Sequence, residues 1–228
     1  MLNRFNMRQH LSIICAAIVL ASASVPGAKA QMLILGPSIN MTNLVNGQDL
    51  IVGDKEFSGF SISGNYQADQ VNVTPIQENG NFGIRFTGAF VSGGQPEDMS
   101  LVYQVSVTNS MNLISAANLD FNGAVTFGTG LAQVVEQVFT NNDQLAGQMQ
   151  VFISATTNQV SQLSASLPIS PPQPFLTLSK DVLLYAELPA FASISDIDQT
   201  FTQVPEPSTI VLAAAGLSAL FLVRRRRH

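Results

Sequence analysis

The side chains that enzymes use most often are missing from the central part of this chain. Between Gln31 and Val204 there is no histidine, no cysteine and no tryptophan. His-based triads, thiol nucleophiles, disulfides and His/Cys zinc sites are therefore excluded from this segment. A hydroxyl–lysine dyad has suitable spacing at Thr177 and Lys180. Residues three apart in a strand point to opposite faces, however, so these two side chains are not expected to meet.

Carboxylates are the remaining candidates for chemistry. Two of them, about 5 to 9.5 Å apart, can hydrolyse a glycosidic bond. Fourteen Asp and Glu residues lie between Gln31 and Val204, so a close pair arises readily by chance. Sugar rings usually stack on aromatic side chains, and the lack of tryptophan weakens such a site. We expect a body without catalytic activity, and the carboxylates that a glycosidase would draw on are Glu78, Glu97, Asp98, Glu136 and Glu187.

Two oxygen-rich stretches could begin a calcium site, which needs several oxygen ligands at about 2.4 Å. Asp196 and Asp198 would share one face of a strand, and residues 141–143 (Asn-Asn-Asp) suit a polar turn. Neither stretch has the spacing of an EF-hand loop, and no glycine-rich phosphate loop follows a strand. Solvated acidic loops explain both stretches better, so we expect no metal and no cofactor.

The charge of the central segment argues against nucleic acid as a partner. Its basic residues are Lys55, Arg85 and Lys180, against fourteen carboxylates. The phosphates of DNA or RNA repel a surface of this sign.

Apolar and polar residues alternate along this segment with the period of a β-strand. Residues 101–107 and 82–86 place apolar side chains at every second position. Residues 57–66, 148–155 and 175–185 are further strand candidates. Because such runs are short and numerous, the pattern predicts a mainly β fold, either an antiparallel β-sandwich or a jelly roll.

Turn signals separate several of these runs. The dipeptides at 79–80 (Asn-Gly), 93–94 (Gly-Gly) and 122–123 (Asn-Gly) can supply the positive φ that tight turns need. Two segments are ambiguous. Residues 109–118 suit a loop with a helical turn, whereas residues 131–139 combine helical spacing with β-branched residues, and there we favour a strand.

The first thirty residues have the three parts of a secretory signal peptide. Basic residues precede an apolar run at 11–21. Ala28 and Ala30 then form the small-x-small pattern that signal peptidase cleaves, so we expect the mature chain to begin at Gln31. The apolar run is short for spanning a bilayer, which argues against an uncleaved anchor. The sequence therefore predicts export through the Sec machinery and cleavage by signal peptidase.

The C-terminal end combines a proline-containing stretch, a short apolar run and a basic tail. Residues 210–223 are apolar and, as a helix, would cover about 21 Å of a hydrocarbon core that is roughly 30 Å thick. Long arginine side chains can reach outward and reduce this mismatch. We expect a single short transmembrane helix at about 208–223 with the body outside. The tail at 224–228 favours the cytoplasmic side through Arg224, Arg225, Arg226 and Arg227.

The order of these parts resembles a PEP-CTERM sorting domain. Pro205, Glu206 and Pro207 form the Pro-Glu-Pro triplet, and the apolar run and the arginines follow it. A generic tail anchor would explain the helix and the arginines but not the triplet. The resemblance implies a Gram-negative bacterium that makes exopolysaccharide. It also implies processing near the triplet by an exosortase, a membrane protease-transpeptidase.

These features divide the chain into a signal peptide (1–30), a β-sandwich ectodomain (31–203) and a sorting domain (204–228). We expect an exported, surface-sorted structural or interaction protein with no catalytic activity of its own. It would pass through the inner membrane with its body outside and reach the cell surface or the extracellular matrix.

The alternative is a β-sandwich that binds or cleaves extracellular polysaccharide. A concave sheet face with two carboxylates and one of the tyrosines Tyr66, Tyr103 or Tyr185 would favour it. A convex face covered by Ser and Thr would argue against it.

Overall fold

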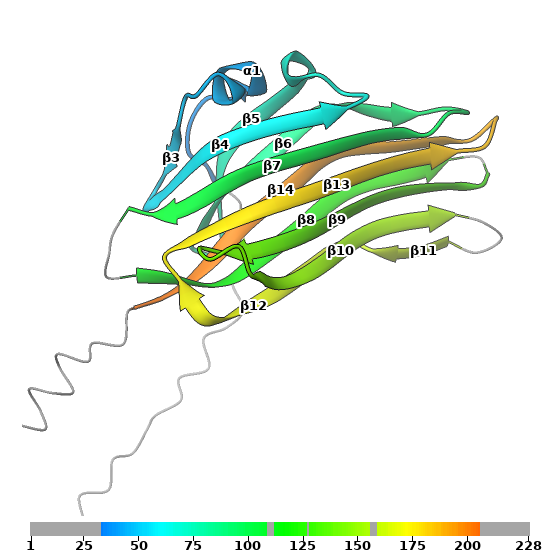
Figure 1. Cartoon of the computed structure of the whole chain (residues 1–228). Coiled ribbons are helices and arrows are strands. Elements are labelled where there is room, and N and C mark those ends of the chain that lie inside the picture. The colour runs from blue at the N-terminus through cyan, green and yellow to red at the C-terminus, as the bar shows by residue number, and fades with distance from the viewer. Residues whose placement is uncertain (1–32, 109–111, 127, 156–158, 206–228) are drawn as a thin grey trace, which may run out of the picture.

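Two antiparallel β-sheets pack face to face in the computed structural model of this chain (Figure 1). The structure describes residues 33–108, 112–126, 128–155 and 159–205. Each sheet has seven strands. The prediction of a mainly β fold is confirmed, and the arrangement is a two-layer sandwich.

The first sheet, called sheet A, contains the last long strand of the described chain near its centre. Its strands follow the spatial order β1 (Leu33–Ile34), β5 (Val71–Glu78), β6 (Asn81–Ser92), β14 (Phe191–Pro205), β8 (Asn112–Thr126) and β12 (Ser164–Gln173), with β2 (Ile39–Asn40) also paired to β5.

The second sheet, called sheet B, has β13 at its centre. Its strands follow the order β11 (Gln159–Gln162), β10 (Leu145–Ala155), β9 (Gly130–Thr140), β13 (Phe175–Ala186), β7 (Glu97–Val107), β4 (Lys55–Gly64) and β3 (Leu50–Val52). Two short helical segments, α1 (Met41–Val45) and η1 (Ala68–Gln70), lie among the N-terminal strands.

The core between the sheets is built from the inward-facing half of each alternating strand. On β7, Leu101, Tyr103 and Val105 are fully buried, as the alternation of residues 101–107 predicts. The ring of Tyr103 stacks on Phe60 at 5.3 Å between centroids and lies 5.6 Å from Phe86 of sheet A. Aromatic side chains therefore join the two layers.

A bulge in β4 explains a burial pattern that simple alternation does not give. Phe57 and Phe60 are three residues apart, yet both side chains are buried. The pairing of β4 with β7 shifts register between Ser58 and Ser61. Gly59 lies in the shift with φ +62°, a backbone angle that residues with a side chain rarely adopt. The extra residue turns both phenylalanines toward the core.

The ambiguous segments and turn signals have mixed outcomes. Residues 131–139 lie in β9, so the predicted strand is confirmed. The helical turn expected within 109–118 is wrong for the described part, because β8 begins at Asn112. The turn at 79–80 is confirmed by the positive φ values of both residues, whereas 122–123 lies inside β8 and is not a turn.

A polar cluster interrupts the core. Glu136 on β9, Lys180 on β13 and Gln199 on β14 have no solvent exposure. Lys180 Nζ contacts Glu136 Oε2 and lies 2.5 Å from Gln199 Oε1. Charged side chains are almost never buried to this extent without a partner, so the three residues form one unit.

Candidate functional site

A polar pocket opens on the outer face of sheet A, between the turn of the β5–β6 hairpin, the middle of β8, β14 and the start of β12. Its volume is about 360 Å³. Strands from four places in the sequence contribute amide, hydroxyl and carboxylate groups. The lining residues are Glu78, Asn79, Asn81, Asn118, Asp120, Ser164, Ala165, Ser166 and Thr200.

Three charged side chains form a row across the sheet beside this pocket. Asp198 on β14 pairs in register with Asp120 on β8 and with Arg85 on β6. Arg85 donates two hydrogen bonds to Asp198, from Nε to Oδ1 and from Nη2 to Oδ2, each 2.6 Å long. Such bidentate pairs are the stronger kind of charge-assisted hydrogen bond, and this one fixes Asp198 in place.

In this row, the pKa of Asp120 is raised above that of an ordinary aspartate. Burial raises the pKa of Asp120 to about 6, and the negative charges of Glu78 and Asp198 add to the effect. Hydrogen bonding to Asp198 also raises the pKa of Arg85, which therefore stays charged. Near neutral pH the pocket is an acidic site with one carboxyl that takes up a proton in mildly acidic solution.

Neutral side chains organise the floor of the pocket. Asn118 Nδ2 donates to Thr202 Oγ1 at 3.2 Å, and Ser166 Oγ donates to Asn118 Oδ1 at 2.7 Å. This network orients the Asn118 amide, so the exposed part of the pocket presents fixed donors and acceptors. Groups of this kind suit a hydroxyl-rich ligand.

The tyrosines that a sugar platform would use lie elsewhere. Tyr103 is fully buried, and Tyr66 is buried with its hydroxyl bonded to the backbone of Val91. Tyr185 lies on β13 of the opposite sheet, where its hydroxyl donates to Glu187 Oε1 at 3.0 Å. The pocket has two carboxylates but no aromatic wall among its lining residues.

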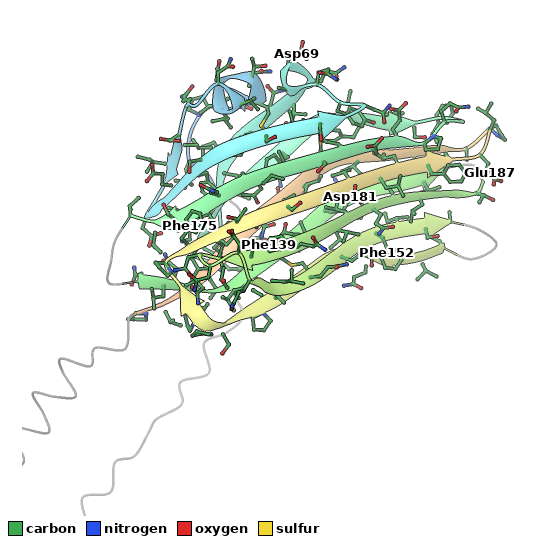
Figure 2. The ribbon with its side chains drawn as sticks, viewed as in Figure 1. Asp69, Phe139, Phe152, Phe175, Asp181 and Glu187 are labelled. Carbon is green, nitrogen blue, oxygen red and sulfur yellow. The ribbon has the colours of Figure 1, made fainter. Side chains whose placement is uncertain are left out.

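The carboxylates that a glycosidase would draw on lie in four separate parts of the structure. Glu78 lies in the pocket, together with Asp120, which the sequence analysis did not single out. Glu136 lies in the core, and Glu97 and Asp98 lie at the start of β7. Glu187 follows the end of β13 and is exposed in Figure 2.

The Thr177–Lys180 pair and one of the two possible calcium stretches can also be placed. Thr177 and Lys180 lie on opposite faces of β13, as expected from their spacing. Asp196 and Asp198 share the outer face of β14, where Arg85 Nη2 lies 3.8 Å from Asp196 and 2.6 Å from Asp198. Within the described ranges, no three His, Cys, Asp or Glu side chains are placed to hold a metal ion.

The sorting motif begins where sheet A ends. Pro205 is the last residue of β14 and pairs in register with Asn112 of β8. The other predicted targeting residues lie outside the described ranges: Ala28, Ala30, Gln31, Glu206, Pro207, Arg224, Arg225, Arg226 and Arg227. The transmembrane helix expected at 208–223 also lies outside them. In the part of the chain that the structure covers, no helix has the length and hydropathy to cross a membrane.

Comparison with protein families identifies the C-terminal segment. The body is a mainly β sandwich, and residues 203–227 match the family model described as the PEP-CTERM protein-sorting motif. The predicted resemblance is therefore confirmed. This chain carries a PEP-CTERM sorting signal, which makes it an exported and sorted protein.

Other comparisons are distant. No curated protein matches the chain. Among solved structures, the enzymatically active domain of bacteriophage CBA120 tailspike protein 4 is 9% identical with a TM-score of 0.26; the match covers 65% of this chain and 19% of that one. A CBM4 structure is 10% identical with a TM-score of 0.29, covering 73% of this chain and 99% of that one. TmCBM27, a carbohydrate-binding module described for mannan recognition, is 8% identical with a TM-score of 0.30, covering 75% and 99%.

The sequence analysis did not predict two features, the Arg85–Asp198 pair and the polar cluster in the core. Arg85 and Asp198 are 113 residues apart, so only the fold brings their pair beside Asp120. The core cluster did leave a signal, because Lys180 occupies an inward position in the series Leu178, Lys180, Val182. A charged residue at an apolar position of an alternating strand indicates a buried polar contact.

Proposed function

We propose that this protein is a non-catalytic structural or interaction protein of the cell surface or extracellular matrix, processed by an exosortase at its C-terminal sorting signal. The observation that carries the proposal is the sorting-motif match at 203–227. The course of β14 supports it, because this strand leads from the core directly to Pro205. The body would thus remain folded while the segment after it is processed.

The route follows from the targeting segments. The signal peptide that ends at Ala30 directs the chain to the Sec machinery, and signal peptidase releases Gln31 as the new N-terminus. The apolar run at 208–223 then holds the chain in the inner membrane, with the arginines of 224–227 on the cytoplasmic side. Exosortase acts near the triplet and delivers the body to its final site.

Mass spectrometry of the mature protein tests the processing step. In a host with an exosortase, we expect the wild-type protein to lack the residues after the processing point. We expect Glu206→Gln, which alters the triplet, to leave the C-terminus intact. Glu187→Gln is a matched control, because Glu187 is an exposed carboxylate outside the motif. A wild-type protein that still ends at His228, or a Glu187→Gln variant that also fails to mature, would contradict the proposal.

The polar pocket favours a second function, the binding of extracellular polysaccharide. Its support is the arrangement of Asn118, Ser166, Glu78 and Asp120, which offers hydrogen-bonding groups to sugar hydroxyls. The lack of an aromatic lining residue argues for modest affinity rather than a stacked sugar ring.

Binding to a glycan array by the full chain tests this second function. We expect a bound glycan to be lost from Asn118→Ala and Ser166→Ala. Ser179→Ala, on the outer side of sheet B, should bind like the wild type. Equal binding by all variants, or no binding to any glycan, would remove the pocket as a sugar site.

A further inference from the structure

Lys180, Glu136 and Gln199 are arranged as a nucleophile, a proton carrier and an acyl group. Lys180 Nζ is 2.5 Å from Gln199 Oε1, so the amine is in direct contact with the carboxamide group whose carbon is Cδ. The same nitrogen contacts Glu136 Oε2. Groups held at contact distance react with a large effective concentration, because the entropy of bringing them together has already been lost.

The strands explain why these three side chains meet. Lys180 and Glu136 are directly paired in register on neighbouring strands of sheet B. Asp181, the next residue after Lys180, points away from the sandwich (Figure 2), so Lys180 points into it. Gln199 faces the core from sheet A. Stacked sheets lie about 10 Å apart, a gap that an inward lysine and an inward glutamine together can span.

The surroundings favour an uncharged, reactive amine. All three side chains are fully buried, and Lys180 Nζ lies 6.0 Å from the centre of the Tyr103 ring. Burial lowers the pKa of Lys180 well below its usual range. The neutral amine is the nucleophilic form of lysine, and a dry core also withholds the water that would hydrolyse an amide product.

Two atoms of the cluster have unused hydrogen-bonding capacity. Gln199 Nε2 and Glu136 Oε1 are buried without a hydrogen-bond partner. Buried polar atoms of this kind are rare and call for an explanation. One is the nitrogen that would have to leave Gln199, and the other belongs to the carboxyl group that would carry its proton.

We propose that Lys180 and Gln199 form an intramolecular amide cross-link between the two sheets, with the Glu136 carboxyl acting as the proton carrier. The lone pair of Lys180 Nζ forms a bond to Gln199 Cδ, and the tetrahedral carbon then breaks its bond to Nε2. One proton passes from Nζ to Nε2 by way of Glu136, which ends in the state in which it began. Nε2 leaves as ammonia, and nothing is oxidised or reduced.

The positions of the three groups favour Gln199 over Glu136 as the acyl group. A link from Lys180 to Glu136 would join neighbouring strands that are already hydrogen-bonded. It would also leave no carboxyl to move the proton, because an amide side chain cannot serve in that role. The link to Gln199 instead joins β13 and β14, the central strands of opposite sheets. Exported proteins often use disulfides for this purpose, and the described body has no cysteine.

The mass of the full chain tests the cross-link directly. We expect the wild-type protein to be lighter than its sequence mass by one ammonia molecule, in addition to any ammonia that an N-terminal Gln31 loses when it cyclises. Cleavage on the N-terminal side of Asp181 and Asp198 separates Lys180 from Gln199 in an unlinked chain. In the linked protein the peptide that ends at Lys180 stays joined to the peptide that begins at Asp198, and fragmentation locates the bond.

Two variants of similar shape provide the comparison. Lys180→Arg removes the nucleophile, and we expect its peptides that carry residues 180 and 199 to separate, with no loss of ammonia from either. Lys55→Arg is the matched control: Lys55 is also buried, but its ion-pair partner is Asp54 at 3.0 Å, and we expect the loss of ammonia to persist. Wild-type peptides that carry Lys180 and Gln199 and separate at their full mass would overturn the proposal, whether or not the variants fold. Loss of one water molecule in place of ammonia would also overturn it, since it would assign the bond to Glu136.

Discussion

Asp198 lies directly opposite Asp120 on one side of β14, and Arg85 lies opposite Asp198 on the other side. Two carboxylates and one guanidinium therefore share three adjacent strands on the outer face of sheet A. The bidentate pair between Arg85 and Asp198 offsets the repulsion between the two acids.

The loss of Arg85 should destabilise the protein. In Arg85→Gln the two acids remain close together, and the partly buried Asp198 loses its counter-charge. We expect a decrease of about 2 kcal/mol in the free energy of unfolding, measured by urea denaturation. Arg85→Lys should lose about half of that amount, because lysine keeps the charge but not the two parallel hydrogen bonds. Equal stability of wild type and Arg85→Gln would contradict this account.

The stability of the protein should depend on the protonation of Asp120. The pKa of Asp120 is about 6 in the folded protein, against about 3.9 for an unperturbed aspartate. Between these two values the folded state binds more protons than the unfolded state, so stability falls as the pH rises through this range.

The Asp120→Asn variant isolates this contribution. Since Asp120 is partly exposed, we discount the shift for solvent screening and expect the variant to gain about 1 kcal/mol over the wild type at pH 7. The gain should disappear near pH 4, where the wild-type carboxyl is protonated in the folded state. Unfolding measured in parallel at both pH values checks this, and a gain independent of pH would exclude the proposed cause.

Gly83 should tolerate no side chain. A Cβ at this position would meet the backbone carbonyl oxygen of Gln199 on the neighbouring strand. We expect Gly83→Ala to force β6 and β14 apart and to cost about 3 kcal/mol or more. Gly36→Ala is the control, because a Cβ there would lie 3.7 Å from Pro75 Cγ, an ordinary contact. Thermal unfolding of both variants makes the comparison, and similar melting temperatures would refute it.

The hydroxyl of Tyr66 should contribute more to stability than that of Tyr185. Tyr66 accepts a hydrogen bond from the Val91 N–H at 3.0 Å and donates to the Val91 oxygen at 3.3 Å. We expect Tyr66→Phe to cost about 1 to 2 kcal/mol, since the part-buried N–H and carbonyl oxygen of Val91 both lose their partner. Tyr185→Phe loses only a hydrogen bond to an exposed carboxylate and should change stability by less than about 0.5 kcal/mol. A reversed order in denaturant titrations would show that burial does not set the difference.

The strands that the sequence predicted best are those with strict alternation. Residues 101–107 in β7 are an example, because every second side chain enters the same core. Irregular strands were harder to predict. In β8, Ile114 and Ala117 are both buried although they are three residues apart, and its pairing with β14 shifts register near Thr202. A shift of this kind breaks the period that sequence analysis relies on.

Residues of the candidate site could be predicted only where they are close together in the sequence. The sorting triplet could be predicted because its residues are contiguous. The polar pocket could not, because Glu78, Asp120 and Ser166 come from three strands whose order in the sheet is not written in the chain. The core cluster lies between these cases. Lys180 and Glu136 each stand at an inward position, but that they meet depends on the register between β13 and β9.

β14 ends at Pro205 while lying between β6 and β8. A pull on the chain beyond Pro205 would act along this strand, parallel to the β14 axis and across the hydrogen bonds to both neighbours. Bonds loaded in shear share the force and must break together, unlike those of a hairpin peeled from its end. A load applied at the end that carries the sorting signal would therefore meet the hydrogen bonds of β14 to both neighbours together.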